Sequence, residues 1–188
     1  VIGGGIAVME TARVSVIRGH KVTLFEKTGR LGGQLQLASR PPYKSQISKL
    51  IDYQARQLSK VGVDVRLNVE ATSVLVGEIK PDAIIIAAGA EPIIPKIPGV
   101  DGQNVVTAAS VLAGDVRAGD EAIVIGGGLV GCETAETLLE QGKKVTIVEM
   151  LDRIGSDIGG ATRWVIMQRL RQAGVRMERQ AEVIKIAR

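Results

Sequence analysis

Short apolar runs alternate with longer stretches of helical periodicity along this chain. The run "AIVI" at 122–125 is typical of a strand buried in a parallel sheet, because polar residues do not interrupt it. The stretch after it carries Ala135, Leu138 and Leu139 at the spacing of one helix face. Strands and helices that alternate with short connections predict an α/β fold, in which helices cover parallel sheets.

The pattern occurs twice, at a constant offset of 123 residues. The stretches "RGHKVTLFEK" at 18–27 and "QGKKVTIVEM" at 141–150 differ by that offset (141 − 18 = 123). The glycines Gly3 and Gly126 and the acids Glu26 and Glu149 are separated by the same number. One offset across separate features indicates an internal repeat. Each copy is predicted to run strand, glycine-rich turn, helix, strand, helix, strand.

The second helix of each copy is predicted from an apolar stripe. The stripe positions are Ile47, Leu50, Ile51, Ala55 and Leu58 in the first copy, and Trp164, Met167, Leu170 and Ala173 in the second. The runs "VGVDVRL" and "AGVRMER" predict the closing strands. The first copy also holds an insertion around "QLQLASRPPYK" (34–44), which is interpreted as a loop.

A proline-rich segment separates the two copies. The run "PDAIIIAAGA" (81–90) predicts a buried strand that ends in a glycine turn. Residues 91–104 then hold three of the six prolines, a composition that neither a helix nor a central strand accepts. The predicted units are residues 1–114 and 115–188, joined by a linker at about 91–104.

Composition restricts the class of partner. The chain has 188 residues, of which 45% are hydrophobic and 23% charged, as in ordinary soluble domains. The net charge of +4 is dispersed and aromatics make up only 2%, so a nucleic-acid partner is not expected. The longest apolar stretch is far shorter than the roughly 20 residues of a membrane helix, so no membrane partner is expected either.

The single cysteine, Cys132, excludes an internal disulfide, a dithiol redox pair and a cysteine-ligated cluster within this chain. No Ser-His-Asp set and no zinc-ligand spacing is found in the sequence. We therefore assign no catalytic side chain and no metal ligand. Such a pattern suits hydride transfer, in which a cofactor carries the chemistry and the protein positions it.

The second glycine turn satisfies a dinucleotide-binding pattern. Gly126, Gly128 and Gly131 have the Gly-x-Gly-x-x-Gly spacing between a predicted strand and a predicted helix. These glycines allow a tight turn, close approach of a pyrophosphate and close helix–strand packing. Glu149 follows at the end of the next strand, where an acid accepts hydrogen bonds from a ribose. Its carboxylate favours NAD(H), while nearby basic residues leave NADP(H) open.

The first turn departs from this pattern at one position. Gly3, Gly5 and Glu26 match, but Val8 occupies the place of the third glycine. A valine there is expected to push the helix from the strand or force repacking, so Val8→Gly is expected to improve nucleotide retention. The run "RLGGQL" (30–35) offers two more glycines for a close backbone approach, or else forms a plain surface loop.

Several stretches, spread over nearly the whole chain, are similar to those of a known protein group. They are "VIGGGIAVMETARV", "GHKVTLFEKTGRLGGQLQLAS", "AIIIAAGAEPIIPKIPG", "NVVTAASVLAG", "VIGGGLVGCETAETL" and "TRWVIMQRLRQAGV". Together they resemble the C-terminal region of the old-yellow-enzyme-linked NADH:flavin oxidoreductases. This group includes 2,4-dienoyl-CoA reductase, 2-enoate reductase and trimethylamine dehydrogenase. The resemblance implies two Rossmann-like dinucleotide-binding units, incomplete at both ends, from a cytoplasmic flavoprotein.

The resemblance also implies cofactor contacts. For FAD, or ADP in some members, they are Gly3, Gly4, Gly5, Ile6 and Ala7 at the pyrophosphate, Glu26 and Lys27 at the ribose, Gly32, Gly33 and Gln34 along the diphosphate, and Ala88 and Gly89 at the flavin nucleotide. For the nicotinamide dinucleotide they are Gly126, Gly127, Gly128, Leu129, Val130, Gly131 and Glu149. Val8, Ile6 and Ala88 differ from the usual residues of the group.

The implied activity is hydride transfer from NADH to FAD, with electrons passed on to a partner domain. In the group that partner is an N-terminal barrel of the same polypeptide, which holds FMN and an iron–sulfur cluster. Two alternatives stay open. One is a non-catalytic nucleotide-binding module with ADP or nothing in the first site. The other is a general pyridine nucleotide reductase whose acceptor is a quinone or a ferredoxin.

Overall fold

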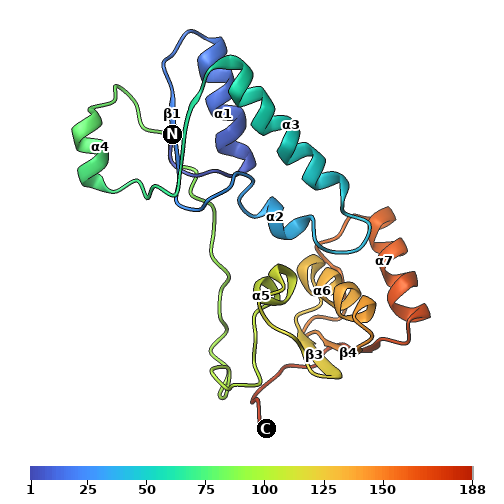
Figure 1. Cartoon of the computed structure of the whole chain (residues 1–188). Coiled ribbons are helices and arrows are strands. Elements are labelled where there is room, and N and C mark those ends of the chain that lie inside the picture. Colours follow the sequence, from blue (N-terminus) through green and yellow to red (C-terminus); the bar gives the residue numbers. More distant parts are fainter. Residues whose placement is uncertain (188) are drawn as a thin grey trace. The chain divides into compact units, whose positions relative to one another are not determined.

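A computed structural model describes residues 1–187 of the chain (Figure 1). It confirms the predicted α/β fold, since its strands pair in parallel and helices lie between them in sequence. The chain divides into two compact units. Unit 1 comprises residues 1–39 and 44–91, and unit 2 comprises residues 40–43 and everything described from 92 onward.

Unit 1 is built on a narrow parallel sheet. Its elements are α1 (Ile6–Ile17), β1 (Thr23–Glu26), α2 (Leu35–Ala38), α3 (Gln46–Val61), β2 (Asp64–Leu67) and α4 (Ser73–Ile79). Strand β1 pairs with β2 on one side. On its other side Phe25 pairs with Ile2, which pairs in turn with Ile86. The spatial order is that of a mononucleotide-binding half of a Rossmann fold, where the first strand lies between the second and the fourth.

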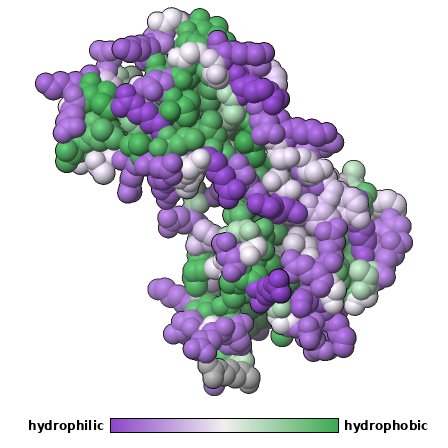
Figure 2. Space-filling view, viewed as in Figure 1, coloured by the Kyte–Doolittle hydropathy of each residue, from purple (hydrophilic) through white to green (hydrophobic). Residues whose placement is uncertain are grey.

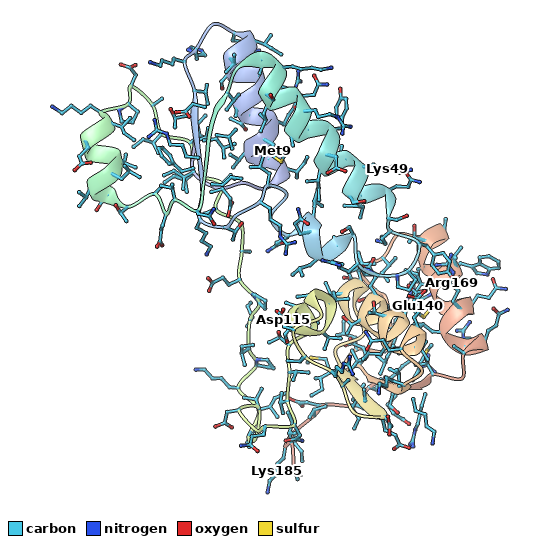
Figure 3. The ribbon with its side chains drawn as sticks, viewed as in Figure 1. Met9, Lys49, Asp115, Glu140, Arg169 and Lys185 are labelled. Carbon is cyan, nitrogen blue, oxygen red and sulfur yellow. The ribbon has the colours of Figure 1, made fainter. Side chains whose placement is uncertain are left out.

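The core of unit 1 lies between helices α1 and α3 and the sheet. Val8, Met9 and Ala12 of α1 are fully buried with Leu24 of β1 and Leu58 of α3. Met9 is marked on α1 in Figure 3. The apolar stripe of α3 therefore faces this core, as its periodicity predicts, although Leu50 remains exposed.

Unit 2 repeats the arrangement. Its elements are α5 (Ala108–Ala113), β3 (Glu121–Ile125), α6 (Leu129–Glu140), β4 (Lys144–Val148), α7 (Gly160–Gln172) and β5 (Arg176–Glu178). The sheet order is β3-β4-β5, with both pairs parallel. Residues 91–107 contain no helix or strand. The division into functional domains at 1–114 and 115–188 stays a prediction.

The core of unit 2 joins α6 and α7 to the sheet. Ala135 and Leu138 of α6 pack with Ile147 of β4 and with Met167 and Leu170 of α7. Trp164, which the sequence places on the apolar stripe of α7, is 67% exposed instead. Ile166 takes its place in the core, because the buried face of α7 is rotated from the predicted one.

Two apolar runs predicted as buried strands are exposed. Ile123 of β3 is 70% exposed, since helices cover only one face of that strand. Ile86 is 72% exposed, because its segment lies at the sheet edge and pairs only with Ile2. Figure 2 shows hydrophobic residues at the surface of both units. The prediction of buried strands was wrong here, because burial depends on packing partners that a local run does not specify.

The insertion at 34–44 is also more structured than a loop. It contains the four-residue helix α2, followed by a turn in which Tyr43 has a φ of 66°. Across the described residues, none of the helices has the length and apolar character that a membrane span requires.

Candidate functional site

The turn between β3 and α6 has the backbone that its glycines predict. Gly126 has a φ of 97°, a left-handed conformation that other residues rarely adopt. Its N–H donates to the carbonyl of Val148, which joins the turn to β4 at 2.9 Å. A side chain at Gly131 would collide with the carbonyl oxygen of Gly126. The third glycine is therefore required for α6 to start so close to the end of β3.

Glu149 lies at the end of β4, against this turn. One carboxylate oxygen accepts the N–H of Gly127 at 2.7 Å and the other accepts the N–H of Leu151 at 2.8 Å. The residue is only 8% exposed, and these two bonds hold its side chain in one orientation. Each carboxylate oxygen has a further lone pair, so the group can still accept a hydroxyl hydrogen at its exposed edge.

The turn between Ile2 and α1 repeats these contacts in unit 1. The N–H of Gly3 donates to the Phe25 carbonyl at 2.8 Å, as Gly126 does to Val148. The N–H of Gly32 donates to the Gly4 carbonyl at 2.7 Å. In unit 2 the N–H of Gly155 donates to the Gly127 carbonyl at 2.6 Å. The two donors and the two acceptors are each 123 residues apart (155 − 32; 127 − 4).

The acid of unit 1 shares one of the two backbone hydrogen bonds that hold the acid of unit 2. The Glu26 carboxylate accepts the N–H of Thr28 at 2.7 Å, and the residue is 7% exposed. It lies so close to Gly4 that a side chain at Gly4 would collide with it. The sequence repeat is thus a repeat of hydrogen bonds around two buried acids.

Val8, which replaces the third glycine of the first turn, lies in a hydrophobic core. It is fully buried in the core with Met9 and Ala12, and α1 still begins at Ile6, directly after the turn. The sequence predicted that valine would either push the helix from the strand or force repacking, and the structure shows its side chain packed in the unit 1 core. Val8 is a core residue of unit 1.

The structure brings the other predicted residues of the first site to the same place. Gly32 pairs with Gly5, and a side chain at Gly33 would lie 3.0 Å from the Gly5 Cα. Gln34 donates its amide to the carbonyl of Ala90 at 2.6 Å, beside Ala88 and Gly89. A side chain at Gly3 would lie 2.6 Å from the Ala87 carbonyl, so the end of this edge segment borders the turn. Lys27 is exposed next to the buried Glu26.

The turn of unit 1 leaves more open space for a phosphate group than the turn of unit 2. A Cβ added at Gly5 would meet nothing within 4 Å, so an open cradle faces the N-terminus of α1. The first N–H groups and the positive end of the helix favour an anion there. In unit 2 the same position is Gly128, where an added Cβ would lie 3.1 Å from a carboxylate oxygen of Asp157.

Asp157 contacts the second turn, and the sequence motif did not point to it. Both of its oxygens accept the N–H of Leu129, the first residue of α6, at 3.1 Å. The repeat itself could have found it, because Asp157 is offset by 123 from Gln34 (157 − 34). Gln34 was assigned to the diphosphate of the first site, whereas its counterpart carries a negative charge.

Helix α6 also buries Glu136 and Cys132. Glu136 is 6% exposed, and its carboxylate lies 3.5 Å from the guanidinium of Arg169. Arg169, on α7, is labelled in Figure 3. Cys132 is fully buried and its thiol faces the Gly127 carbonyl at 3.5 Å. Burial, with a smaller effect from the Asp157 charge, raises the pKa of the Cys132 thiol to about 12. Cys132 is therefore a protonated core residue at neutral pH.

This two-turn architecture matches a known family over the whole chain. The family described as pyridine nucleotide-disulphide oxidoreductase matches residues 1–188. The chain belongs to this family.

Individual members are similar over most of the chain. An NADH oxidase of Thermoanaerobacter brockii is 45% identical over 179 residues, which are 93% of this chain and 28% of that protein. A cinnamate reductase of Clostridium sporogenes is 44% identical over 160 residues, 85% of this chain and 24% of the relative. A solved structure of a 2-naphthoyl-CoA reductase complex is similar to this chain, with a TM-score of 0.95 and 33% identity. The match covers all of this chain and 28% of the reductase chain.

These shares show that this family member spans about a quarter of the length of the relatives that it matches. The solved reductase matches this chain over its whole length, within a much longer chain. The family assignment confirms the resemblance to flavoprotein reductases drawn from the sequence.

Proposed function

We propose that this chain is the dinucleotide-binding part of a flavin-dependent NAD(P)H oxidoreductase. Unit 1 binds FAD through the turn at Gly3–Ala7 and the loop at Gly32–Gln34, with Glu26 and Lys27 at the ribose and Ala88 and Gly89 at the flavin nucleotide. Unit 2 binds NADH through Gly126–Gly131 and Glu149. When bound, this pair of cofactors supplies hydride transfer, and the protein contributes position and electrostatics.

The observation that carries the proposal is the recurrence of one hydrogen-bond pattern around two turns. In both units a glycine in the left-handed region opens the turn, a buried glutamate lies against it and a helix begins directly after it. A helix N-terminus with a glycine turn favours a pyrophosphate, and the acid favours an adenosine ribose. Two such places in one chain suit two dinucleotides.

Several features favour reduction of FAD by NADH as the specific reaction. A carboxylate at Glu149 disfavours the 2′-phosphate of NADPH. Cys132 is fully buried and is the single cysteine of this chain, so the chain forms no dithiol of its own, and electrons are expected to leave through the flavin to a partner domain. Relatives more than three times this length, named as an NADH oxidase and a cinnamate reductase, are consistent with such a partner in the same polypeptide.

The test uses matched alanine substitutions in the full-length protein. Gly5→Ala places a methyl group in the open cradle of unit 1, where it meets no protein atom within 4 Å. Because the backbone at Gly5 is extended, alanine fits there without strain. We expect flavin affinity to fall about tenfold or more, measured as flavin absorbance per polypeptide after gel filtration, with folding retained.

Gly128→Ala is the reciprocal variant in unit 2. We expect it to retain the flavin absorbance but to need at least about tenfold more NADH for anaerobic bleaching of the flavin. Gly77→Ala, in α4, makes the same chemical change where an added Cβ also meets nothing within 4 Å, so it should alter neither property.

The outcomes separate the hypotheses. Wild-type flavin affinity in Gly5→Ala would show that the first turn does not hold the flavin. A full-length protein that is colourless and cannot be reconstituted with FAD would favour the non-catalytic nucleotide-binding module. Normal bleaching by NADH in Gly128→Ala would remove the second turn from the reaction.

A further inference from the structure

A carboxylate of the chain itself occupies the anion position of the second turn. Both oxygens of Asp157 accept the N–H of Leu129 at 3.1 Å, at the N-terminus of the twelve-residue helix α6. This N–H is among those that a dinucleotide pyrophosphate uses in a turn of this kind. A single N–H cannot make a full hydrogen bond to a carboxylate and to a phosphate at once. The two anions must therefore compete.

The first turn provides an internal comparison. Its counterpart of Asp157 is Gln34, a neutral residue whose amide is directed to the Ala90 carbonyl. The cradle at Gly5 is consequently open, whereas Gly128 faces the Asp157 carboxylate. The two turns share their backbone hydrogen bonds, so the side chain at this one position distinguishes an open cradle from a closed one.

The surroundings of Asp157 allow its carboxylate to leave without unfolding the turn. Its neighbours Ile154 and Ile158 are buried in the core of unit 2 and hold the backbone of this segment. Asp157 itself is exposed, and its side chain is held by the hydrogen bonds that it accepts from Leu129. Rotation about its side-chain torsions is enough to release the N–H.

We propose that Asp157 is an internal mimic of the phosphate, which caps α6 in the ligand-free state and must be displaced when a dinucleotide binds. This inference rests on the proposed binding of a dinucleotide by the second turn. Asp157 lowers the affinity of unit 2 for the pyrophosphate-containing cofactor, and so favours release after turnover. It also stabilises the ligand-free unit, because a negative charge at a helix N-terminus is favourable.

The test measures binding and stability of the full-length protein, independently of catalysis. The ligand is ADP-ribose, which has the pyrophosphate and adenosine but no nicotinamide, titrated by calorimetry. Asp157→Asn keeps the shape of the side chain and removes its charge. We expect ADP-ribose to bind about tenfold more tightly to this variant, while the thermal midpoint of the ligand-free protein falls.

Two controls isolate the mechanism. Asp152→Asn removes one charge from an exposed position of the same segment and should leave the affinity for ADP-ribose unchanged. Adenosine has no phosphate, so its binding should be the same in wild type and in Asp157→Asn. A gain that also appears with adenosine or with Asp152→Asn would contradict direct competition and overturn the proposal.

The remaining outcomes distinguish this proposal from the one on which it rests. If wild type binds ADP-ribose but Asp157→Asn binds it equally or more weakly, Asp157 is only a structural cap and the inference fails alone. If neither protein binds ADP-ribose, and Gly128→Ala does not change NADH-dependent bleaching, the proposed role of the second turn fails as well.

Discussion

At the scale of single residues, the two turns differ at the position of the third glycine. Gly131 is required because any side chain would collide with the Gly126 carbonyl oxygen. Val8, at the same place in the repeat, is instead fully buried between α1 and the sheet. The same turn is therefore stabilised in two ways, by close backbone contact in unit 2 and by side-chain packing in unit 1.

This burial reverses the effect expected of Val8→Gly. Removing a buried valine leaves a cavity, and a glycine inside α1 costs about 1 kcal/mol in helix propensity. We expect unit 1 to lose about 3 kcal/mol of unfolding free energy and to bind flavin more weakly, as measured by urea denaturation and flavin content.

Val8→Ala is the matched control for this prediction. It creates most of the cavity but keeps a good helix former, so its loss should be smaller by about 1 kcal/mol. Tighter flavin binding in Val8→Gly would instead support the view that the missing glycine weakens the site.

At the scale of the elements, helices with similar caps differ in what they contribute. Thr107 caps α5 by accepting the Ser110 N–H at 3.1 Å, and Thr72 caps α4 by accepting the Leu75 N–H at 3.2 Å. Helix α5 buries Val111 and Leu112, whereas α4 buries none of its residues. Of these two caps, the one on α5 stabilises a helix that packs into a hydrophobic core.

Alanine at each cap should expose this difference. Thr107→Ala is expected to lower the unfolding free energy of unit 2 by about 1 kcal/mol, the usual value of an N-cap. Thr72→Ala should leave global stability unchanged and only increase hydrogen exchange within α4, because that helix can fray alone. Chemical denaturation and amide exchange measure the two effects. Equal losses for both variants would contradict this account.

At the scale of the whole molecule, the chain uses one pattern twice with different surroundings. Glu26 and Glu149 are both buried against a glycine turn and both accept backbone N–H groups. The residues around the two acids differ, and the cofactors proposed for the two sites differ as well. Selectivity is thus expected to be local to each copy, although the backbone arrangement is common to both.

Neutralising each acid tests this separation. Glu149→Gln should weaken NADH binding about tenfold and reduce discrimination against NADPH, because the charge that repels a 2′-phosphate is gone. Flavin content should stay at the wild-type level. Glu26→Gln is the converse variant, with lower flavin retention and unchanged ADP-ribose affinity. Calorimetry and absorbance measure both, and loss of both cofactors in either variant would refute local selectivity.

Much of the architecture could be predicted without coordinates. Glycines at fixed spacing, acids at the strand ends and a constant offset of 123 are local signals, and each constrains the backbone by itself. They predicted the parallel sheets and the position of Glu149 at the end of a strand, and Glu149 does follow directly after β4. Exposure of Ile86 and Trp164 could not be predicted, because it depends on which elements pack nearby.

The sequence by itself determined the repeat, the α/β class and the two turns, because those features follow from backbone requirements of glycine and from hydrophobic periodicity. Only the tertiary structure decided that Val8 belongs to a core and that Asp157 closes the second cradle. Both depend on contacts between segments. Val8 fills space between its helix and the sheet, and Asp157 accepts the N–H of Leu129, which lies 28 residues away in the sequence.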